Sequence, residues 1–246
     1  MPGRAAAAVR HHLGLLRHRW MPPASAKADH ELAFWTERWE PQLRAGQLTG
    51  PDTLELSGDQ LVADTYEGRR RQQARAEVRR VLREAELPDD FFDGKTVLDI
   101  GSGALGFPDA CPAAVSISVE PLTHRYAAAG LLLDSDAVYL AVGAEDIPLR
   151  SQSVDVVVSR NNLDHVDDPQ AVLSEVKRLL RPGGAFVLNV DVDHTPTPSE
   201  PHRLPVAELR HWLAPLRIAS ERHWDHPHGA DGHAVVIVAH APEGPR

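Results

Sequence analysis

The sequence contains a single cysteine, Cys111, and no long apolar run. One cysteine excludes an intramolecular disulfide and a zinc site built from several thiolates, and it fits a reducing compartment. The most hydrophobic stretches are far shorter than the roughly 18 to 20 residues that a membrane-spanning helix needs. These absences predict a soluble chain with no membrane partner and a cytoplasmic location.

Lysine is scarce too: of the 26 lysines and arginines, only Lys27, Lys95 and Lys177 are lysines, whereas proline occurs 20 times. We attribute this bias to a GC-rich bacterial genome. The formal charge of −9 combines +4 on the first 30 residues with −13 on the rest. Because an acidic body repels phosphate backbones, we expect a small-molecule partner and no nucleic acid.

We expect the chain to form three sections. Residues 1–28 are a basic arm, rich in arginine and alanine, which fits either a loosely ordered segment or an organellar transit peptide. Residues 29–89 are a helical N-terminal extension. Residues 90–246 are the main domain, of ordinary size for a globular fold.

Two amphipathic helices are predicted in the extension. The first covers about residues 29–45, with Asp29 as its N-cap and Pro41 as a possible bend. Its apolar stripe consists of Leu32, Trp35, Trp39 and Leu43. The second covers about residues 65–87, with a stripe of Ala74, Val78, Val81, Leu82 and Ala85. Glutamates are interleaved with its many arginines, so we expect a solvated face there.

Seven short, β-branched runs follow from residue 95. They are residues 96–100, 115–119, 137–141, 154–158, 185–190, 216–220 and 234–239. Nearly continuous apolar strands that alternate with crossover segments are typical of a parallel sheet covered on both faces. Ligands of such sheets bind beyond the carboxyl ends of the strands, so we sought site residues there.

The first strand ends in a glycine-rich turn. Its residues are Asp99, Ile100, Gly101, Ser102, Gly103 and Gly106. Glycines let the backbone turn tightly and approach a ligand closely. A dinucleotide would suit this pattern as well, but Asp99 precedes the glycines, no basic residue is near, and Pro108 and Pro112 leave little room for a phosphate-binding helix. A ligand without phosphate fits better.

The second strand is closed by Glu120, 19 residues after Gly101. A carboxylate at that point can accept hydrogen bonds from both hydroxyls of a ribose. Ala144 and Glu145 follow the third strand, where an adenine edge would lie, and Asn161 follows the fourth. These positions support a nucleoside ligand without identifying it.

Together these segments resemble the class I S-adenosylmethionine-dependent methyltransferases that act on small molecules. The resemblance covers about residues 90–190 and rests on the glycine-rich turn and on residues 143–149, 163–169 and 179–186. It implies an α/β, Rossmann-like, seven-stranded sheet, mostly parallel with the last strand antiparallel, and S-adenosylmethionine as cofactor. The cofactor-binding residues that it implies are Asp99, Gly101, Ser102, Gly103, Glu120, Ala144, Glu145 and Asn161.

Methyl transfer to a hydroxyl or an ammonium also needs a base at the rim of the sheet. His194, after the fifth strand, and His165, after the fourth, are the candidates because histidine has a suitable pKa. A packing or helix-start role is the alternative for His165. The loop after the fifth strand also carries Asp191, Asp193, Glu200 and His202.

A second histidine-rich segment, residues 223–233, joins the sixth and seventh strands. Its spacing matches no metal-binding motif, and turn-forming residues dominate it. We therefore expect a polar loop there and name no metal ligands, with a divalent-metal site in this segment as the less favoured alternative.

Aromatic residues gather before the main domain. We expect Trp35, Trp39 and Tyr66 either to cover the acceptor pocket or to pack on the helices of the sheet. The predicted activity is methyl transfer to an oxygen or nitrogen of a small molecule, in a monomer or a homodimer. A nicotinamide-dependent oxidoreductase and a catalytically silent relative that binds a cofactor or a partner stay open as alternatives.

Overall fold

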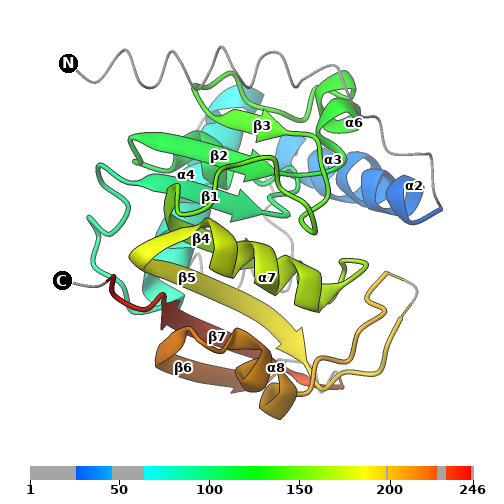
Figure 1. Ribbon diagram of the computed structural model, residues 1–246. Coiled ribbons are helices and arrows are strands. Elements are labelled where there is room, and N and C mark those ends of the chain that lie inside the picture. Colours follow the sequence, from blue (N-terminus) through cyan, green and yellow to red (C-terminus); the bar gives the residue numbers. More distant parts are fainter. Residues whose placement is uncertain (1–25, 46–63, 198, 226–230, 245–246) are drawn as a thin grey trace.

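The computed structural model describes residues 26–45, 64–197, 199–225 and 231–244, and a seven-stranded sheet forms its centre (Figure 1). The strand order is β3-β2-β1-β4-β5-β7-β6. The strands are β1 (Thr96–Ile100), β2 (Val115–Val119), β3 (Val138–Leu140), β4 (Val154–Arg160), β5 (Leu180–Val192), β6 (Arg217–Asp225) and β7 (His233–His240). Strands β1 to β5 pair in parallel, whereas β7 runs antiparallel to both β5 and β6. The predicted Rossmann-like sheet is confirmed.

Helices cover both faces of the sheet. They are α2 (Ala26–Ala33), the π-helix η2 (Phe34–Trp39), α3 (Glu40–Arg44), α4 (Tyr66–Glu84), α5 (Phe107–Ala110), α6 (Thr123–Ala128), α7 (Pro169–Leu179) and α8 (Val206–Leu213). Figure 1 shows α7 and α8 in front of the sheet and α4 behind it. No helix in the described residues combines the length and the hydropathy that crossing a membrane requires.

Alternation along the strands builds the two halves of the core. Neighbouring residues of a strand point to opposite faces, so Leu98 packs with the α7 side chains and Val97 with those of α4. The same alternation separates Val157 from its neighbours Val156 and Val158. Because both faces are covered, the strands are apolar at nearly every position, as the sequence indicated.

The N-terminal helical segment differs from its prediction at its start. Helix α2 begins by Ala26, so Asp29 lies in its first turn and not at the N-cap, and its carboxylate pairs with Arg125 at 2.7 Å. Pro41 falls in the first turn of α3, directly after η2. Proline has no N–H to donate to the carbonyl four residues earlier in an α-helix. The residues before Pro41 form the wider π turn, and the helical segment continues through Pro41 without a break.

Helix α4 begins where the sequence predicted, with the Thr65 hydroxyl accepting a hydrogen bond from the Gly68 N–H. Its apolar stripe packs on the sheet. Arg70 departs from the expected solvated face: it is buried and donates to the Ala104 carbonyl at 3.1 Å. The glycine-rich turn exposes that carbonyl toward the helix, so a tertiary contact overrides the local charge pattern. The boundary between residues 29–89 and 90–246 stays a prediction.

Two strand boundaries were predicted wrongly. Strand β5 begins at Leu180 instead of residue 185, because the chain stays extended through a bulge opposite Val154 and Val156. The expected loop over residues 223–233 is strand at both of its ends, residues 223–225 and 233, since the β6–β7 ladder continues to the Asp225–His233 pair. Residues 226–230 lie outside the described residues.

Candidate active site

The glycine-rich turn after β1 is held by the carboxylate that closes β2. Gly101 and Gly103 have φ values of +71° and +53°, which favour glycine. The Glu120 Oε2 accepts a hydrogen bond from the Gly103 N–H at 3.1 Å, and its Oε1 accepts one from the Leu122 N–H at 2.8 Å. The Ser102 and Ser118 hydroxyls lie 2.7 Å apart beneath the turn. This edge of the site is therefore rigid before any ligand binds.

Two carboxyl groups are buried at this edge. Burial raises the pKa of Glu120 to about 7, although its two backbone hydrogen bonds act in the opposite direction. Burial likewise raises the pKa of Asp99 to about 7, while the Arg160 guanidinium lowers it. Arg160 itself pairs with Glu77 of α4 at 2.7 Å. The extension thus contributes a charged group to the electrostatics of the strand ends.

Of the two asparagines after β4, the sequence analysis expected Asn161 to lie at the ligand site, but the structure places Asn162 against the glycine-rich turn. Asn161 is exposed, has a φ of +44° and donates its N–H to the Asn189 carbonyl at 2.8 Å. Asn162 is the one that lies on the glycine-rich turn. A Cβ added to Gly101 would come within 2.1 Å of the Asn162 Cγ. The side chain next to the cofactor loop is therefore that of Asn162.

The two residues expected at the adenine edge, Ala144 and Glu145, lie in the segment that follows β3. Ala144 is buried, and the Glu145 Oε1 accepts a hydrogen bond from the Asp167 N–H at 3.1 Å. Gly143 leaves room for that carboxylate, because a Cβ there would meet the Glu145 Oε2 at 2.8 Å. Glu145 thus links the loops that follow β3 and β4.

The N-terminal helices pack directly on the glycine-rich turn. A Cβ on Gly103 would lie 2.7 Å from Cζ2 of Trp35, whose indole N–H donates to the Glu31 carboxylate at 2.8 Å. Trp35 also contacts Trp39 and Tyr126 edge to face. This tryptophan covers the glycine-rich turn at Gly103. Tyr66, in contrast, packs against the Arg44 guanidinium.

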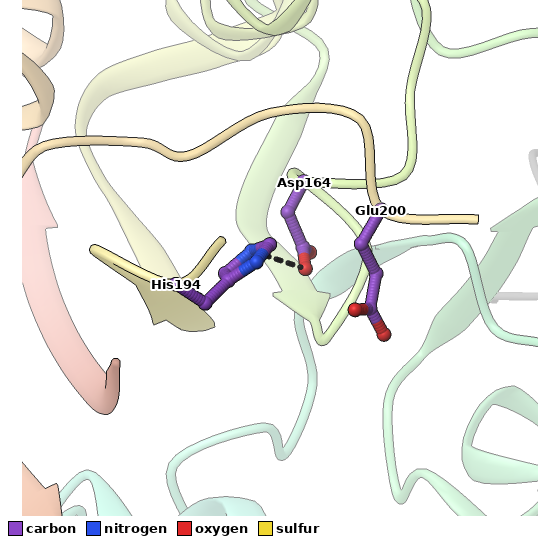
Figure 2. Close-up of side chains that lie close together, drawn as sticks. All are labelled: Asp164, His194 and Glu200. Atoms are coloured by element: carbon purple, nitrogen blue, oxygen red, sulfur yellow. Dashed lines mark ion pairs between the residues drawn. The ribbon is translucent and has the colours of Figure 1, made fainter. Parts of the chain in front are cut away.

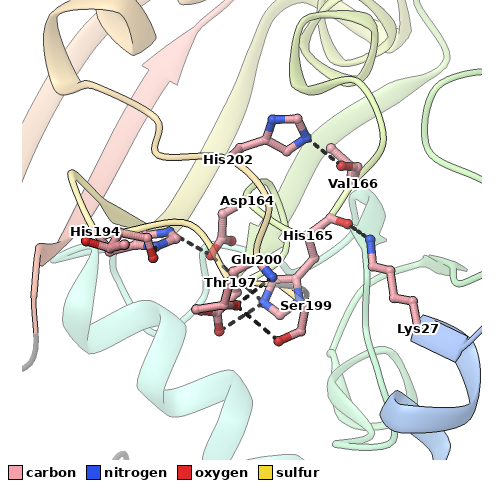
Figure 3. Close-up of polar contacts among 10 residues, drawn as sticks. Lys27, Asp164, His165, Val166, His194, Thr197, Ser199, Glu200 and His202 are labelled. Atoms are coloured by element: carbon pink, nitrogen blue, oxygen red, sulfur yellow. Dashed lines mark hydrogen bonds and ion pairs between the residues drawn. The ribbon is translucent and has the colours of Figure 1, made fainter.

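A second polar group, which we call the Asp164 cluster, comprises Asp164, His165, His194 and Glu200 (Figures 2 and 3). His194 Nε2 lies 3.5 Å from Asp164 Oδ2. His165 Nε2 lies 3.8 Å from Glu200 Oε1 and 3.9 Å from Asp164 Oδ2. Both histidines predicted as bases therefore face one carboxylate, and the loops after β4 and β5 bring them together.

The Asp164 side chain is fully buried, and neither of its oxygens has a hydrogen-bond partner among the described residues. Burial raises its pKa to about 6, and His165 lowers it. His194 is buried as well, with Nδ1 3.1 Å from the Thr195 carbonyl. A carbonyl only accepts, so the Nδ1 atom of His194 donates to it, and the Nε2 atom faces Asp164.

Several contacts fix the loop that carries His194. The Thr195 N–H and hydroxyl both donate to Asp231, and a Cβ on Gly232 would come within 2.8 Å of the His194 backbone nitrogen. The His202 Nε2 lies 2.9 Å from the Val166 carbonyl, so this loop is also in contact with the segment that follows β4.

Lys27 of α2 donates to the His165 carbonyl, so the N-terminal helix reaches this cluster too (Figure 3). Thus η2 contacts the glycine-rich turn through Trp35, and α2 contacts the Asp164 cluster through Lys27.

The other histidine pair is already satisfied. His223 Nε2 lies 2.7 Å from Glu221 Oε1, and its Nδ1 lies 2.9 Å from His233 Nε2, with the two rings stacked. These ring nitrogens have hydrogen-bond partners, unlike the Nε2 atoms of His165 and His194 in the Asp164 cluster.

Sequence reasoning missed Asp164 and Asn162. Each is adjacent to a residue that was singled out, His165 and Asn161, within the segment that follows β4. A signal for Asp164 was available, because a carboxylate directly beside a candidate base can hold that base. Which of the neighbouring residues turns inward depends on the positive φ at Asn161, which the sequence does not display.

A family model described as a methyltransferase domain matches residues 98–188. A methyltransferase of Mycolicibacterium vanbaalenii is 33% identical over 159 residues, which cover 62% of this chain and 60% of that protein. Another, from Mycobacteroides abscessus, is 33% identical over 105 residues, 40% of either chain. For this part of the chain, the predicted resemblance to class I S-adenosylmethionine-dependent methyltransferases is confirmed. The chain spans 60% or less of the length of these two relatives.

Solved structures agree on the fold of the methyltransferase domain. An S-adenosylmethionine-dependent methyltransferase from Mesorhizobium loti superposes with a TM-score of 0.54 and 16% identity, covering 67% of this chain and 96% of that one. A geranyl diphosphate C-methyltransferase from Streptomyces coelicolor A3(2) has a TM-score of 0.56 and 15% identity, covering 89% and 98%. At such identities the likeness concerns the fold alone, and the larger coverage of the second extends beyond the matched domain.

Proposed function

We propose that the protein transfers the methyl group of S-adenosylmethionine to an oxygen or nitrogen of a small molecule. The observation that carries this proposal is the Glu120 carboxylate, held against the glycine-rich turn at the strand ends of a methyltransferase domain. Its oxygens keep free lone pairs for two ribose hydroxyls. We assign the methionine and ribose side to Asp99, Gly101, Ser102, Gly103 and Glu120, and the adenine side to Ala144 and Glu145. Asn161 was predicted here, and Asn162 is the better placed neighbour.

The chemistry asks little of the donor. The acceptor attacks the methyl carbon, the carbon–sulfur bond breaks, and the sulfonium becomes the neutral thioether of S-adenosylhomocysteine. The acceptor loses one proton. We assign this side of the reaction to the Asp164 cluster, in which His194 and His165 are the candidate proton acceptors.

A small acceptor is favoured by the cover over the strand ends. Helices α2 and η2 lie over the cofactor turn, and Lys27 joins them to the segment after β4. Such a cover would exclude water from the sulfonium and would suit a small substrate. The acidic body of the chain argues further against a nucleic-acid acceptor.

Calorimetric titration with S-adenosylmethionine, S-adenosylhomocysteine and NAD tests the proposal. We expect the first two to bind and NAD not to bind. Glu120→Ala should weaken both by about 1.5 to 3 kcal/mol, the cost of losing charge-assisted hydrogen bonds. Glu208→Ala, at an exposed carboxylate on α8, is the matched control and should change nothing.

Binding of NAD in place of S-adenosylmethionine would favour the oxidoreductase alternative. S-adenosylmethionine binding without S-adenosylhomocysteine release, across a panel of hydroxyl and amine acceptors, would favour the silent relative. Equal affinity of the Glu120→Ala variant would remove Glu120 from the site.

A further inference from the structure

Three side chains of the Asp164 cluster converge from separate segments. Asp164 follows β4, His194 follows β5, and Glu200 lies farther along the loop after β5 (Figure 2). One ligand atom of each lies within 4.8 Å of the others. Ligand atoms that share one ion at about 2.1 Å lie roughly 3 to 4 Å apart, so small side-chain rotations bring these three into range.

Burial without partners is the second observation. Asp164 is fully buried, with both oxygens unpaired by any hydrogen bond from the described residues. His194 Nε2 lies 3.5 Å from Asp164 Oδ2, and its Nδ1 lies 3.1 Å from the Thr195 carbonyl. A buried carboxylate that accepts no hydrogen bond is costly unless a positive species lies beside it. Ligation of a metal through one ring nitrogen, with a carbonyl on the other, is the usual arrangement for histidine.

No arginine or lysine of the described residues supplies that positive charge, and the basic groups within 4 Å of the carboxylates of the Asp164 cluster are the rings of His165 and His194. None of the described arginines or lysines forms an ion pair with Asp164 or Glu200. The Lys27 ammonium donates to the His165 carbonyl instead. Asp191 and Glu200 add negative charge around Asp164. The local field therefore favours a cation.

We propose that Asp164, His194 and Glu200 bind one divalent transition-metal ion of the Mn²⁺, Co²⁺ or Zn²⁺ class. One imidazole and two carboxylates suit these ions better than Mg²⁺, which prefers oxygen ligands alone. Three protein ligands leave coordination positions open.

The use of that ion rests on the proposed function: an acceptor hydroxyl bound to it would lose its proton more readily and would be held near the sulfonium. In that state His194 is a ligand and no longer a candidate proton acceptor. Binding of the ion itself does not depend on the methyl transfer.

The test uses the full chain, treated with EDTA and then titrated with MnCl₂, CoCl₂ and ZnCl₂ by calorimetry. We expect one ion per chain for at least one metal, a higher melting temperature with that metal, and visible absorption bands from bound Co²⁺. Asp164→Asn and Glu200→Gln should each weaken binding at least about tenfold. His223→Gln alters the other histidine pair and is the matched control, expected to bind as the wild type does.

Three results would overturn the proposal: no one-to-one binding of any of the three ions, equal affinity in both carboxylate variants, or loss of binding in His223→Gln. Glu200 is only half-buried, so its variant guards against a folding failure in Asp164→Asn. A parallel titration with S-adenosylmethionine separates the two proposals. A protein that binds the cofactor but no ion contradicts this inference alone, and one that binds the ion but no cofactor contradicts the proposed function alone.

Discussion

Glu120 and Asp164 are both buried carboxyl groups beyond the carboxyl ends of parallel strands, yet their surroundings differ. Each oxygen of Glu120 accepts a backbone N–H, from Gly103 and Leu122. Neither oxygen of Asp164 has such a partner in the described part of the chain. The groups nearest Asp164 are two imidazoles and a further carboxylate.

This difference separates two kinds of preorganisation. The Glu120 edge is complete as a piece of protein, so a ligand adds hydrogen bonds to a geometry that already exists. The Asp164 cluster carries a desolvation cost that no hydrogen bond to Asp164 from the described residues offsets. Sites that bind or react with a ligand are where such costs are expected.

The largest effect is expected for Gly101→Ala. The added Cβ would lie 2.1 Å from the Asn162 Cγ, and the residue has a φ of +71°. We expect cofactor affinity to fall more than about 100-fold, as measured by calorimetry, because the turn must move away from its ligand.

Gly130→Ala is the matched control, since Gly130 has a φ of +69° and nothing within 4 Å of the added Cβ. It should show only the strain of a left-handed alanine, about 1 kcal/mol in the free energy of unfolding. The double variant Gly101→Ala with Asn162→Gly should recover part of the affinity. Similar losses in both single variants would mean that the close contact does not matter.

His194→Ala changes the Asp164 cluster instead of the glycine-rich turn. We expect turnover to fall by about a hundredfold, through loss of the base or of a metal ligand, while cofactor affinity stays nearly intact. Steady-state kinetics and calorimetry on the same preparation measure the two effects. His223→Ala is the control, and an equal loss of cofactor affinity in His194→Ala would indicate a structural role.

Trp35→Ala tests whether the cover over the glycine-rich turn matters. Trp35 is buried against Gly103 and Tyr126, whereas its neighbour Phe34 is exposed. We expect about a tenfold loss in kcat/KM from a site that is less shielded from water. Phe34→Ala should stay within about twofold. Equal effects would show that these helices serve stability rather than the site.

The smallest effect is a pH dependence. Burial raises the pKa of Glu120 to about 7, and ribose hydroxyls donate to the ionised form. Cofactor affinity should therefore rise a few-fold between about pH 6 and about pH 8, and Glu120→Gln should flatten the rise. A wild-type profile that is flat or falls over this range would contradict the assignment.

The contribution of Glu120 to the free energy of unfolding should fall as pH rises, opposite to the cofactor affinity. Because the native pKa of Glu120 exceeds the unfolded value of 4.5, the native state holds the proton between that value and about pH 7. The contribution of Glu120 to the free energy of unfolding is present below this window and is lost as pH rises through it. Urea denaturation at both ends of the window measures the free energy of unfolding of the wild type and of Glu120→Gln. Asp99 makes a similar contribution in both proteins, so it cancels when the variant is subtracted from the wild type.

Much of the fold could be predicted because the apolar and turn-forming residues of each short segment indicate its secondary structure. Strands β1 and β2 have the predicted bounds, since an apolar run between turn residues has few other ways to bury itself. The errors at β5 and at residues 223–233 arose where pairing with a neighbouring strand extends a strand through glycine, proline or histidine. Such pairing depends on the partner and not on the residues themselves.

The sequence by itself determined the succession of the strands along the chain, the glycine-rich turn and the carboxylate that closes β2, because these follow from the order of the chain and from residue type. Only the tertiary structure decided that Trp35 covers Gly103, that Asn162 lies on Gly101, and that Asp164, His194 and Glu200 meet. These contacts join segments far apart in the chain. Their geometry depends on how the loops return over the sheet, and no local periodicity encodes that path.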